Sequence, residues 1–395
     1  MMGQAIDWEM LASHGTAPMV GCSMLGVGYE DAFDRLLKTY VDGRFARGLS
    51  SEKLVVGPFG SGKTHFLRQM MELAAAKDVV VSEVRLNKDL DFTKRLLFYR
   101  EVAAEVAAPG QSERGIAGLL RAMRAKVCGA APDEIKDVLF EAWISGLGAQ
   151  DFRLDAFKRV AMAGLTALRT QDEPTFSAAA RWLSGDVNDP VLAKALMESR
   201  VGTDQQSLFA GRMLLSLFQL VRHAGFLGTV LAVDEAEQGF SVDKKRRDRI
   251  LSMLKSDVDS ISALNGGSAL VLYALTPEIR EAMDTFPALH QRFADPGGVG
   301  FFDGNQYAAV IDLTFRADPT MHLRGIARRL LEVFSGENEL PGGVSKADAM
   351  ARVDQIADEV AGANLSSSAR RQLVRTVCAY LLGIEGITVS GETEY

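Results

Sequence analysis

One glycine-rich octapeptide constrains the fold of this chain more than any other feature of the sequence. It matches the pattern G-x-x-x-x-G-K-[ST] and consists of Gly57, Pro58, Phe59, Gly60, Ser61, Gly62, Lys63 and Thr64. Glycines allow backbone N–H groups to turn inward around phosphate oxygens without clashes from Cβ atoms. The apolar run at residues 53–56 predicts a strand before the loop, and residues 64–76 have helical spacing. Strand, loop and helix in this order predict a P-loop that binds ATP together with Mg²⁺.

Two side chains of the loop carry its chemistry. Lys63 is expected to place a cation against the β- and γ-phosphates, and Thr64 is expected to offer its hydroxyl to the metal ion. The helix that begins here adds the positive end of its dipole. His65 follows in the first turn and belongs to the predicted nucleotide-binding segment. We expect it to pack and not to catalyse, because phosphoryl transfer depends on positioning and charge.

A second motif, at residues 231–235, is an apolar run that ends in two acids. We expect Asp234 to hold the Mg²⁺ shell and Glu235 to orient and deprotonate the attacking water. An apolar run before Asp-Glu is common by itself. Its position downstream of the P-loop, followed by another predicted strand at 269–275, favours ATP hydrolysis over simple nucleotide storage.

Several other polar residues are candidates for contact with the phosphates. Thr276 follows the predicted strand at 269–275, where AAA+-type ATPases carry a polar sensor; the alternative is a strand-capping threonine before a proline. Arg292 is the candidate arginine finger for a neighbouring subunit, with Arg280 as its competitor. Either arginine is equally explained as a surface charge. A predicted C-terminal helix carries Arg370, Arg371 and Arg375. These arginines are candidates for a second sensor that reaches the phosphates; the alternative is a solvated basic face.

The pattern of strands and helices predicts an α/β fold. A second strand at 78–86 and a helix at 94–107 continue the strand–helix alternation, which implies a parallel sheet. Helical patterns without strands then predict an insertion at about 109–205. We expect an N-terminal extension over 1–28, a P-loop ATPase core over 29–318 and a C-terminal helical domain over 319–395.

Composition limits the class of protein. The chain has 47% hydrophobic and 24% charged residues and a net charge of −7, which is typical of a packed soluble protein. Its apolar runs are shorter than a membrane-spanning helix requires, and its N-terminus does not resemble a secretory signal, so we expect a cytoplasmic location. The three cysteines are widely separated, which fits neither a disulfide framework nor a zinc motif.

A basic cluster follows the acidic motif and offers a possible contact for DNA phosphates. Ordinary solvation is the alternative for a basic run of this length. The cluster consists of Lys244, Lys245, Arg246, Arg247 and Arg249.

With these residues in view, the chain resembles the ATP-binding proteins of BREX-type phage-defence systems, the BrxD-like family, which is related to AAA+ and origin-recognition ATPases. The resemblance is carried by four blocks in matching order, at residues 57–67, 81–84, 233–237 and 270–277. Many ATPases share the first and third blocks, and the combination with the other two points to this family. The resemblance implies an ATPase that works in a bacterial defence or DNA-handling complex encoded by one operon, often beside a helicase.

Three functions remain open from the sequence. The first is an oligomeric AAA+-like ATPase that remodels or loads a DNA-bound partner such as a helicase. The second is a signalling switch of the STAND type, in which ATP binding matters more than turnover. The third is a DNA-binding adaptor with little turnover. The sequence does not identify the partner, the number of subunits or an effect of DNA on turnover.

Overall fold

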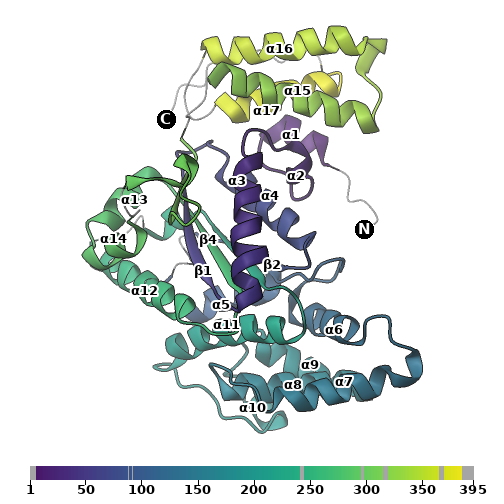
Figure 1. Cartoon of the computed structure of the whole chain (residues 1–395), viewed down its shortest axis with the longest axis vertical. Helices are drawn as coiled ribbons and strands as arrows, with labels where there is room; N and C mark the ends of the chain where they lie inside the picture. The colour runs from purple at the N-terminus through teal and green to yellow at the C-terminus, as the bar shows by residue number, and fades with distance from the viewer. Residues whose placement is uncertain are drawn as a thin grey trace.

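A computed structural model describes residues 6–87, 89–90, 92–240, 244–294, 298–314, 319–363 and 369–384. Three regions follow one another along the long axis of the molecule (Figure 1). Helices from the C-terminal part of the chain lie at one end, a twisted sheet with its flanking helices lies in the middle, and a group of helices lies at the other end. The nucleotide-binding motifs belong to the middle region.

The central sheet has five parallel strands in the order β2-β3-β4-β1-β5. β3 and β4 are buried along their whole length, as the continuous apolar runs in their sequences predict for strands of a parallel sheet. The predicted α/β fold with a parallel sheet is therefore confirmed. The strands are β1 (Ser51–Val56), β2 (Val80–Arg85), β3 (Thr229–Asp234), β4 (Ala269–Leu275) and β5 (Val310–Asp312).

Helices cover both faces of the sheet, because successive side chains of each strand point to opposite sides. Val230 and Ala232 of β3 face a core that also contains side chains of α3, the π-helix η1 and α4. Leu231 and Val233 face the core formed with α5, α11 and α12. The helices are α3 (Glu30–Leu36), η1 (Leu37–Arg44), α4 (Lys63–Ala75), α5 (Arg95–Glu105), α11 (Gln206–His223) and α12 (Lys244–Ser262).

Residues 109–205 are all described and contain five helices and no strand. Their apolar side chains extend the core that lies beneath α5 and α11, so this region packs against the sheet domain at its lower end (Figure 1). The helices are α6 (Gly115–Cys128), α7 (Asp133–Leu147), α8 (Asp155–Thr170), α9 (Glu173–Leu183) and α10 (Pro190–Ala195).

The C-terminal helices form a separate core that includes the beginning of the chain. α15 (Pro319–Glu337), α16 (Lys346–Ala363) and α17 (Ala369–Leu381) pack together, and α1 (Trp8–His14) lies against α17. The ring of Trp8 meets that of Phe334 edge to face, with 5.1 Å between centroids. Sequence periodicity did not indicate this contact, because a helix of two turns shows too little of a repeat.

None of the described helices combines the length and the apolar character that crossing a bilayer requires.

Candidate functional site

The P-loop connects β1 to α4 and depends on its glycines. Gly60 and Gly62 have φ angles of +74° and +91°, a backbone region that side chains with a Cβ rarely adopt. A Cβ on Gly57 would lie 2.4 Å from Ser61 Oγ, so the loop closes only around a glycine there. Gly57 N–H donates to Leu275 O over 3.1 Å, which joins the start of the loop to the end of β4.

The ammonium group of Lys63 lies inside the loop. Lys63 is only 8% exposed, and its Nζ donates to Gly57 O over 2.8 Å and to Pro58 O over 3.2 Å. Glu237 Oε1 lies 3.8 Å from the same nitrogen. Burial is the main cause that raises the pKa of Glu237 above its usual range. A cation held on neutral carbonyl oxygens and one carboxylate is poised to exchange these partners for phosphate oxygens.

Thr64 and Asp234 bring together the oxygens predicted to hold the metal. Thr64 Oγ1 donates to Asp234 Oδ2 over 2.7 Å, across 170 residues of sequence. Asp234 ends β3, is 1% exposed and also accepts from Glu235 N–H at Oδ1 over 2.9 Å. Hydroxyl and carboxylate oxygens are the hard donors that Mg²⁺ prefers.

These residues fit a triphosphate with its metal ion. Residues 59–64 of the loop line a pocket, and Ser61 Oγ is buried without a hydrogen-bond partner among the described residues. A buried hydroxyl left in this way is costly unless a ligand or water satisfies it. The cation of Lys63 and the oxygens of Thr64 and Asp234 are the kinds of group that bind phosphates and Mg²⁺.

Glu235 follows Asp234 with a φ of +51°, an uncommon backbone conformation for a residue other than glycine. Such strain is found most often at functional sites. The side chain of Glu235 accepts a hydrogen bond from Gln238 Nε2. Gln238 therefore holds the carboxylate predicted to activate water.

Thr276 lies beside the loop, as its position after β4 requires. β4 lies between β1, which leads into the P-loop, and β3, which ends at Asp234. The residue that follows β4 therefore lies between the ends of these two strands. Thr276 is buried and precedes α13 (Pro277–Asp284) as its N-cap residue. Its side chain does not line the pocket beside the P-loop and is hydrogen-bonded to the carboxyl group of Glu278.

The two candidate finger arginines lie on the neighbouring short helices and form local ion pairs. Arg292, on α14 (Pro287–Phe293), bonds Asp259 through Nη2 over 2.7 Å and keeps half of its side chain exposed. Arg280, on α13, pairs with Asp284. Neither lines the pocket beside the P-loop of its own chain.

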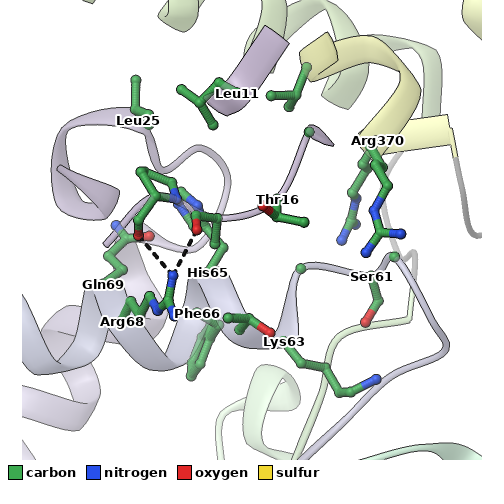
Figure 2. Close-up of a pocket in the computed structure, with 18 of the residues that line it drawn as sticks. Leu11, Thr16, Leu25, Ser61, Lys63, His65, Phe66, Arg68, Gln69 and Arg370 are labelled. Atoms are coloured by element: carbon green, nitrogen blue, oxygen red, sulfur yellow. Dashed lines mark hydrogen bonds between the residues drawn. The ribbon is translucent and has the colours of Figure 1, made fainter. Parts of the chain in front are cut away.

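A pocket of about 460 Å³ lies above the P-loop (Figure 2). It is lined by residues of the loop, of α15 and α17, and of segment 15–28, which we call the N-terminal strap. One side of the pocket carries charged and hydroxyl groups of the P-loop. The other side is mainly apolar and includes Met10, Leu11, Leu25, Val27, Tyr29, Ile326, Leu330 and Val374.

The C-terminal helix α17 contributes arginines to this pocket. Arg370 is buried and lies over the P-loop near Ser61 in Figure 2, with Nη1 3.4 Å from the position that a Cβ on Gly62 would take. Arg371 also lines the pocket, whereas the side chain of Arg375 lies against Gly15. The sequence identified three arginines of this helix as candidates, and the tertiary structure brings the first two to the nucleotide site.

His65 lines the pocket and has a lowered pKa, of about 4, mainly because burial disfavours the imidazolium form. A neutral imidazole in the first turn of α4 suits the packing role expected from the sequence.

The basic cluster lies at the start of α12, and its described side chains, those of Lys245, Arg247 and Arg249, do not line the pocket. Lys245 and Arg249 are exposed and Arg247 is half-buried, while the side chains of Lys244 and Arg246 lie outside the described part of the chain.

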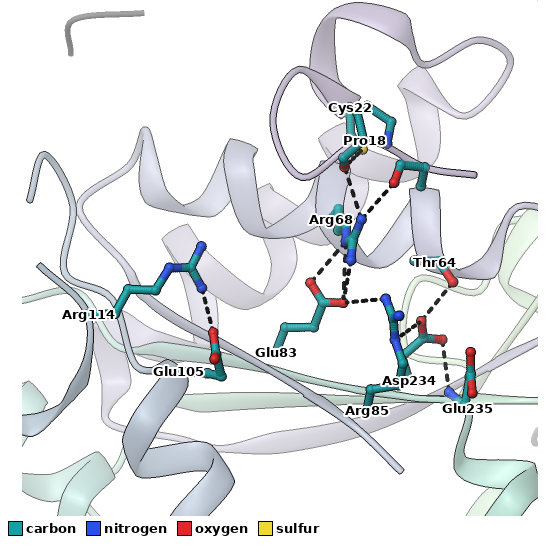
Figure 3. A network of polar contacts seen from close by, with 11 residues as sticks. Pro18, Cys22, Thr64, Arg68, Glu83, Arg85, Glu105, Arg114, Asp234 and Glu235 are labelled. Atoms are coloured by element: carbon teal, nitrogen blue, oxygen red, sulfur yellow. Dashed lines mark hydrogen bonds and ion pairs between the residues drawn. The ribbon is translucent and has the colours of Figure 1, made fainter. Parts of the chain in front are cut away.

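Sequence reasoning missed a polar network that surrounds Asp234, the predicted metal ligand (Figure 3). Arg68 on α4 pairs with Glu83 on β2 over 3.0 Å, and Arg85 at the end of β2 approaches both Glu83 and Asp234. Arg68 also donates to Ala17 O and Pro18 O of the strap, over 2.7 and 3.1 Å. The available signal was the presence of charged residues inside segments that are otherwise apolar, which usually means that they are paired.

Comparison with known proteins supports one family. Neither the curated proteins nor the solved structures contain a match to the chain. The sequence model of the family described as BREX system ATP-binding protein BrxC/D matches residues 10–386, which include the P-loop, the acidic motif and all three C-terminal helices. The family resemblance predicted from the motifs is confirmed. By this match over nearly its whole length, the chain belongs to the BrxC/D family of BREX system ATP-binding proteins.

Proposed function

We propose that this protein is an AAA+-like ATPase that binds ATP with Mg²⁺ and hydrolyses it in a bacterial phage-defence complex. The observation that carries the proposal is the 2.7 Å contact between Thr64 Oγ1 and Asp234 Oδ2, beside Lys63 and directly before Glu235. This arrangement joins a P-loop to an acid pair, and the family match supports ATP as the ligand.

The pocket above the loop supports an adenine site. An aromatic base needs an apolar surface of limited width, and the strap together with α15 and α17 supplies one next to the P-loop. We infer that the base lies between the strap and the C-terminal helices, with the triphosphate running toward Lys63. In that orientation Arg370 contacts phosphate and acts as the second sensor.

The residues of the site then have separate roles. Lys63 and the loop N–H groups bind the β- and γ-phosphates, and Thr64 and Asp234 would hold Mg²⁺. When bound, Mg²⁺ would supply positive charge that neutralises the charge developing on the phosphates. The carboxylate of Glu235 gives up its hydrogen bond to Gln238 and accepts the proton of the attacking water. Thr276 positions the γ-phosphate or that water.

Assembly and partners follow from the same proposal. Half of the Arg292 side chain is exposed, so Arg292 could leave its ion pair with Asp259 and contact the nucleotide bound to a neighbouring subunit. This supports a homo-oligomer. The partner is an operon-encoded helicase or defence protein that this ATPase remodels or loads on DNA in the cytoplasm, and the exposed part of the basic cluster offers a contact for DNA.

A STAND-like switch is the second candidate. The observation that favours it is that the P-loop, the strap and helices α15 and α17 all line one pocket, because nucleotide bound there would be coupled to the position of the C-terminal helices. Slow turnover with tightly held nucleotide would support this alternative.

The proposal is tested with Glu235→Gln, using Glu281→Gln on exposed α13 as a matched control. Glu235→Gln is expected to bind ATP with wild-type affinity in calorimetry, to lose about 100-fold or more in turnover, and to accumulate the assembled form in mass measurements. Normal turnover in Glu235→Gln excludes Glu235 as the base. Failure of the folded wild type to bind ATP with Mg²⁺ removes the whole proposal.

A further inference from the structure

Arg85 lies next to the carboxylate that the proposed function assigns to the metal ion. In the parallel pairing of β2 with β3, Arg85 is the register partner of Asp234. Its Nε lies 3.9 Å from Asp234 Oδ2, the same oxygen that accepts the hydrogen bond of Thr64. A guanidinium group therefore stands beside the carboxylate oxygen that faces the metal position.

Arg85 also approaches a second carboxylate. Its Nη2 lies 3.5 Å from Glu83 Oε1, two residues earlier on the same face of β2 (Figure 3). Both distances are at or beyond the outer limit for a hydrogen bond, so Arg85 is shared between two acids and held closely by neither. Half of its side chain is exposed, which leaves it free to shift.

Glu83, by contrast, is fixed in place. Its side chain is 13% exposed, and Arg68 binds both carboxylate oxygens through Nε and Nη2 at 3.0 Å. Arg68 is itself held by two strap carbonyls, those of Ala17 and Pro18. The network thus has one mobile cation between a rigid acceptor, Glu83, and the buried Asp234.

We propose that Arg85 is a positioning residue that neutralises Asp234 in the metal-free site and moves to Glu83 when a divalent cation binds. The inference rests on the proposed function, because it takes Asp234 as a metal ligand. Two cations next to one carboxylate oxygen repel each other, so Arg85 opposes metal binding while it stays at Asp234. Glu83 lowers this opposition by offering Arg85 another carboxylate a short distance away.

The proposal makes predictions of opposite sign for two neighbouring residues. Arg85→Gln removes the competing charge and is expected to tighten divalent-cation binding by about three- to tenfold, since the exposed guanidinium is partly screened. Glu83→Gln removes the acid that Arg85 and Arg68 share, which leaves Asp234 as the remaining carboxylate near both guanidinium groups, and is expected to weaken cation binding.

The test measures the binding of Mn²⁺ by electron paramagnetic resonance, with the full chain saturated by a non-hydrolysable ATP analogue. Arg114→Gln is the matched control: Arg114 has 51% of its side chain exposed and pairs with Glu105, away from Asp234 (Figure 3). Its Mn²⁺ affinity should equal that of the wild type. Since Arg85 is half-exposed, Arg85→Gln is expected to fold. Its Mn²⁺ affinity therefore decides the question even if Glu83→Gln fails to fold.

Unchanged or weaker Mn²⁺ binding by Arg85→Gln overturns the proposal. The failure of the proposed function has a different signature, because in that case the wild type itself binds neither the analogue nor Mn²⁺ at this site. Tighter binding in Arg85→Gln with unchanged binding in Arg114→Gln supports the assignment of Arg85.

Discussion

Glu72 fastens the N-terminal strap to the helix that starts at the P-loop, and its removal is expected to loosen the nucleotide pocket. The carboxylate lies on α4 and accepts hydrogen bonds from three successive backbone N–H groups, those of Gly21, Cys22 and Ser23, over 2.7, 3.1 and 2.7 Å. These donors form the N-terminal end of α2 (Cys22–Leu25), which has no other side-chain cap. Glu72 therefore supplies the cap from another part of the chain.

The size of the effect follows from these bonds. Glu72→Gln preserves the shape of the side chain but removes its charge and replaces one acceptor oxygen with an N–H₂ group. That group is a donor, so it cannot accept a hydrogen bond from the backbone N–H that faces it. The two remaining bonds become neutral, and one is lost. Since a hydrogen bond to a charged group contributes about 1.5–3 kcal/mol and one between neutral groups about 1 kcal/mol, the exchange of three charged bonds for two neutral ones is expected to cost about 2.5 kcal/mol or more.

Two measurements test this expectation. Urea unfolding should show the lower stability of the part of the protein that contains the strap and the C-terminal helices. A fluorescent ATP analogue should bind about tenfold more weakly, which corresponds to about 1.4 kcal/mol, because strap residues line the pocket. The control is Glu332→Gln, an exposed partner of Arg329, which should change stability by less than about 0.5 kcal/mol. Wild-type stability and affinity in Glu72→Gln would refute the idea that this carboxylate holds the strap.

Two further predictions concern His65 and Arg370. Burial lowers the pKa of His65 to about 4, so the unfolded chain binds more protons than the folded protein between about pH 6.5 and 4. The free energy of unfolding should therefore fall as the pH drops through this window, by about 2 kcal/mol at pH 5. Urea unfolding of His65→Gln at pH 7.5 and pH 5 should show that this part of the loss is gone. Arg370→Ala should weaken ATP binding about tenfold or more and ADP binding less, as measured by calorimetry, if its guanidinium contacts the terminal phosphate; equal losses for both nucleotides would contradict that role.

Much of the sheet domain was predictable because its signals are local. The P-loop needs glycines at fixed spacing, and buried parallel strands need continuous apolar runs such as the one at β4. Both patterns are complete within a few residues. The acids at the end of β3 were identified for the same reason, since the end of a buried strand beside a P-loop leaves few other roles for Asp234 and Glu235.

The arrangement of the strap and of the C-terminal helices was not predictable from such patterns. α1 packs on α17, more than 350 residues away in the sequence, and Glu72 and Arg68 attach the strap through backbone atoms of residues 17–23, which any sequence possesses. A carboxylate that binds main-chain N–H groups requires no particular residue type in its partner. No motif therefore marks the contact.

The sequence by itself determined that the chain has a P-loop, an acid pair and a parallel sheet, because each depends on side chains near one another along the chain. Only the tertiary structure decided which charges surround that site. Arg370 rather than Arg375 reaches the pocket, and Arg85 stands beside Asp234, since these positions depend on how helices and strands pack across long separations. Electrostatic interactions follow distance in space, and distance in space is set by the fold.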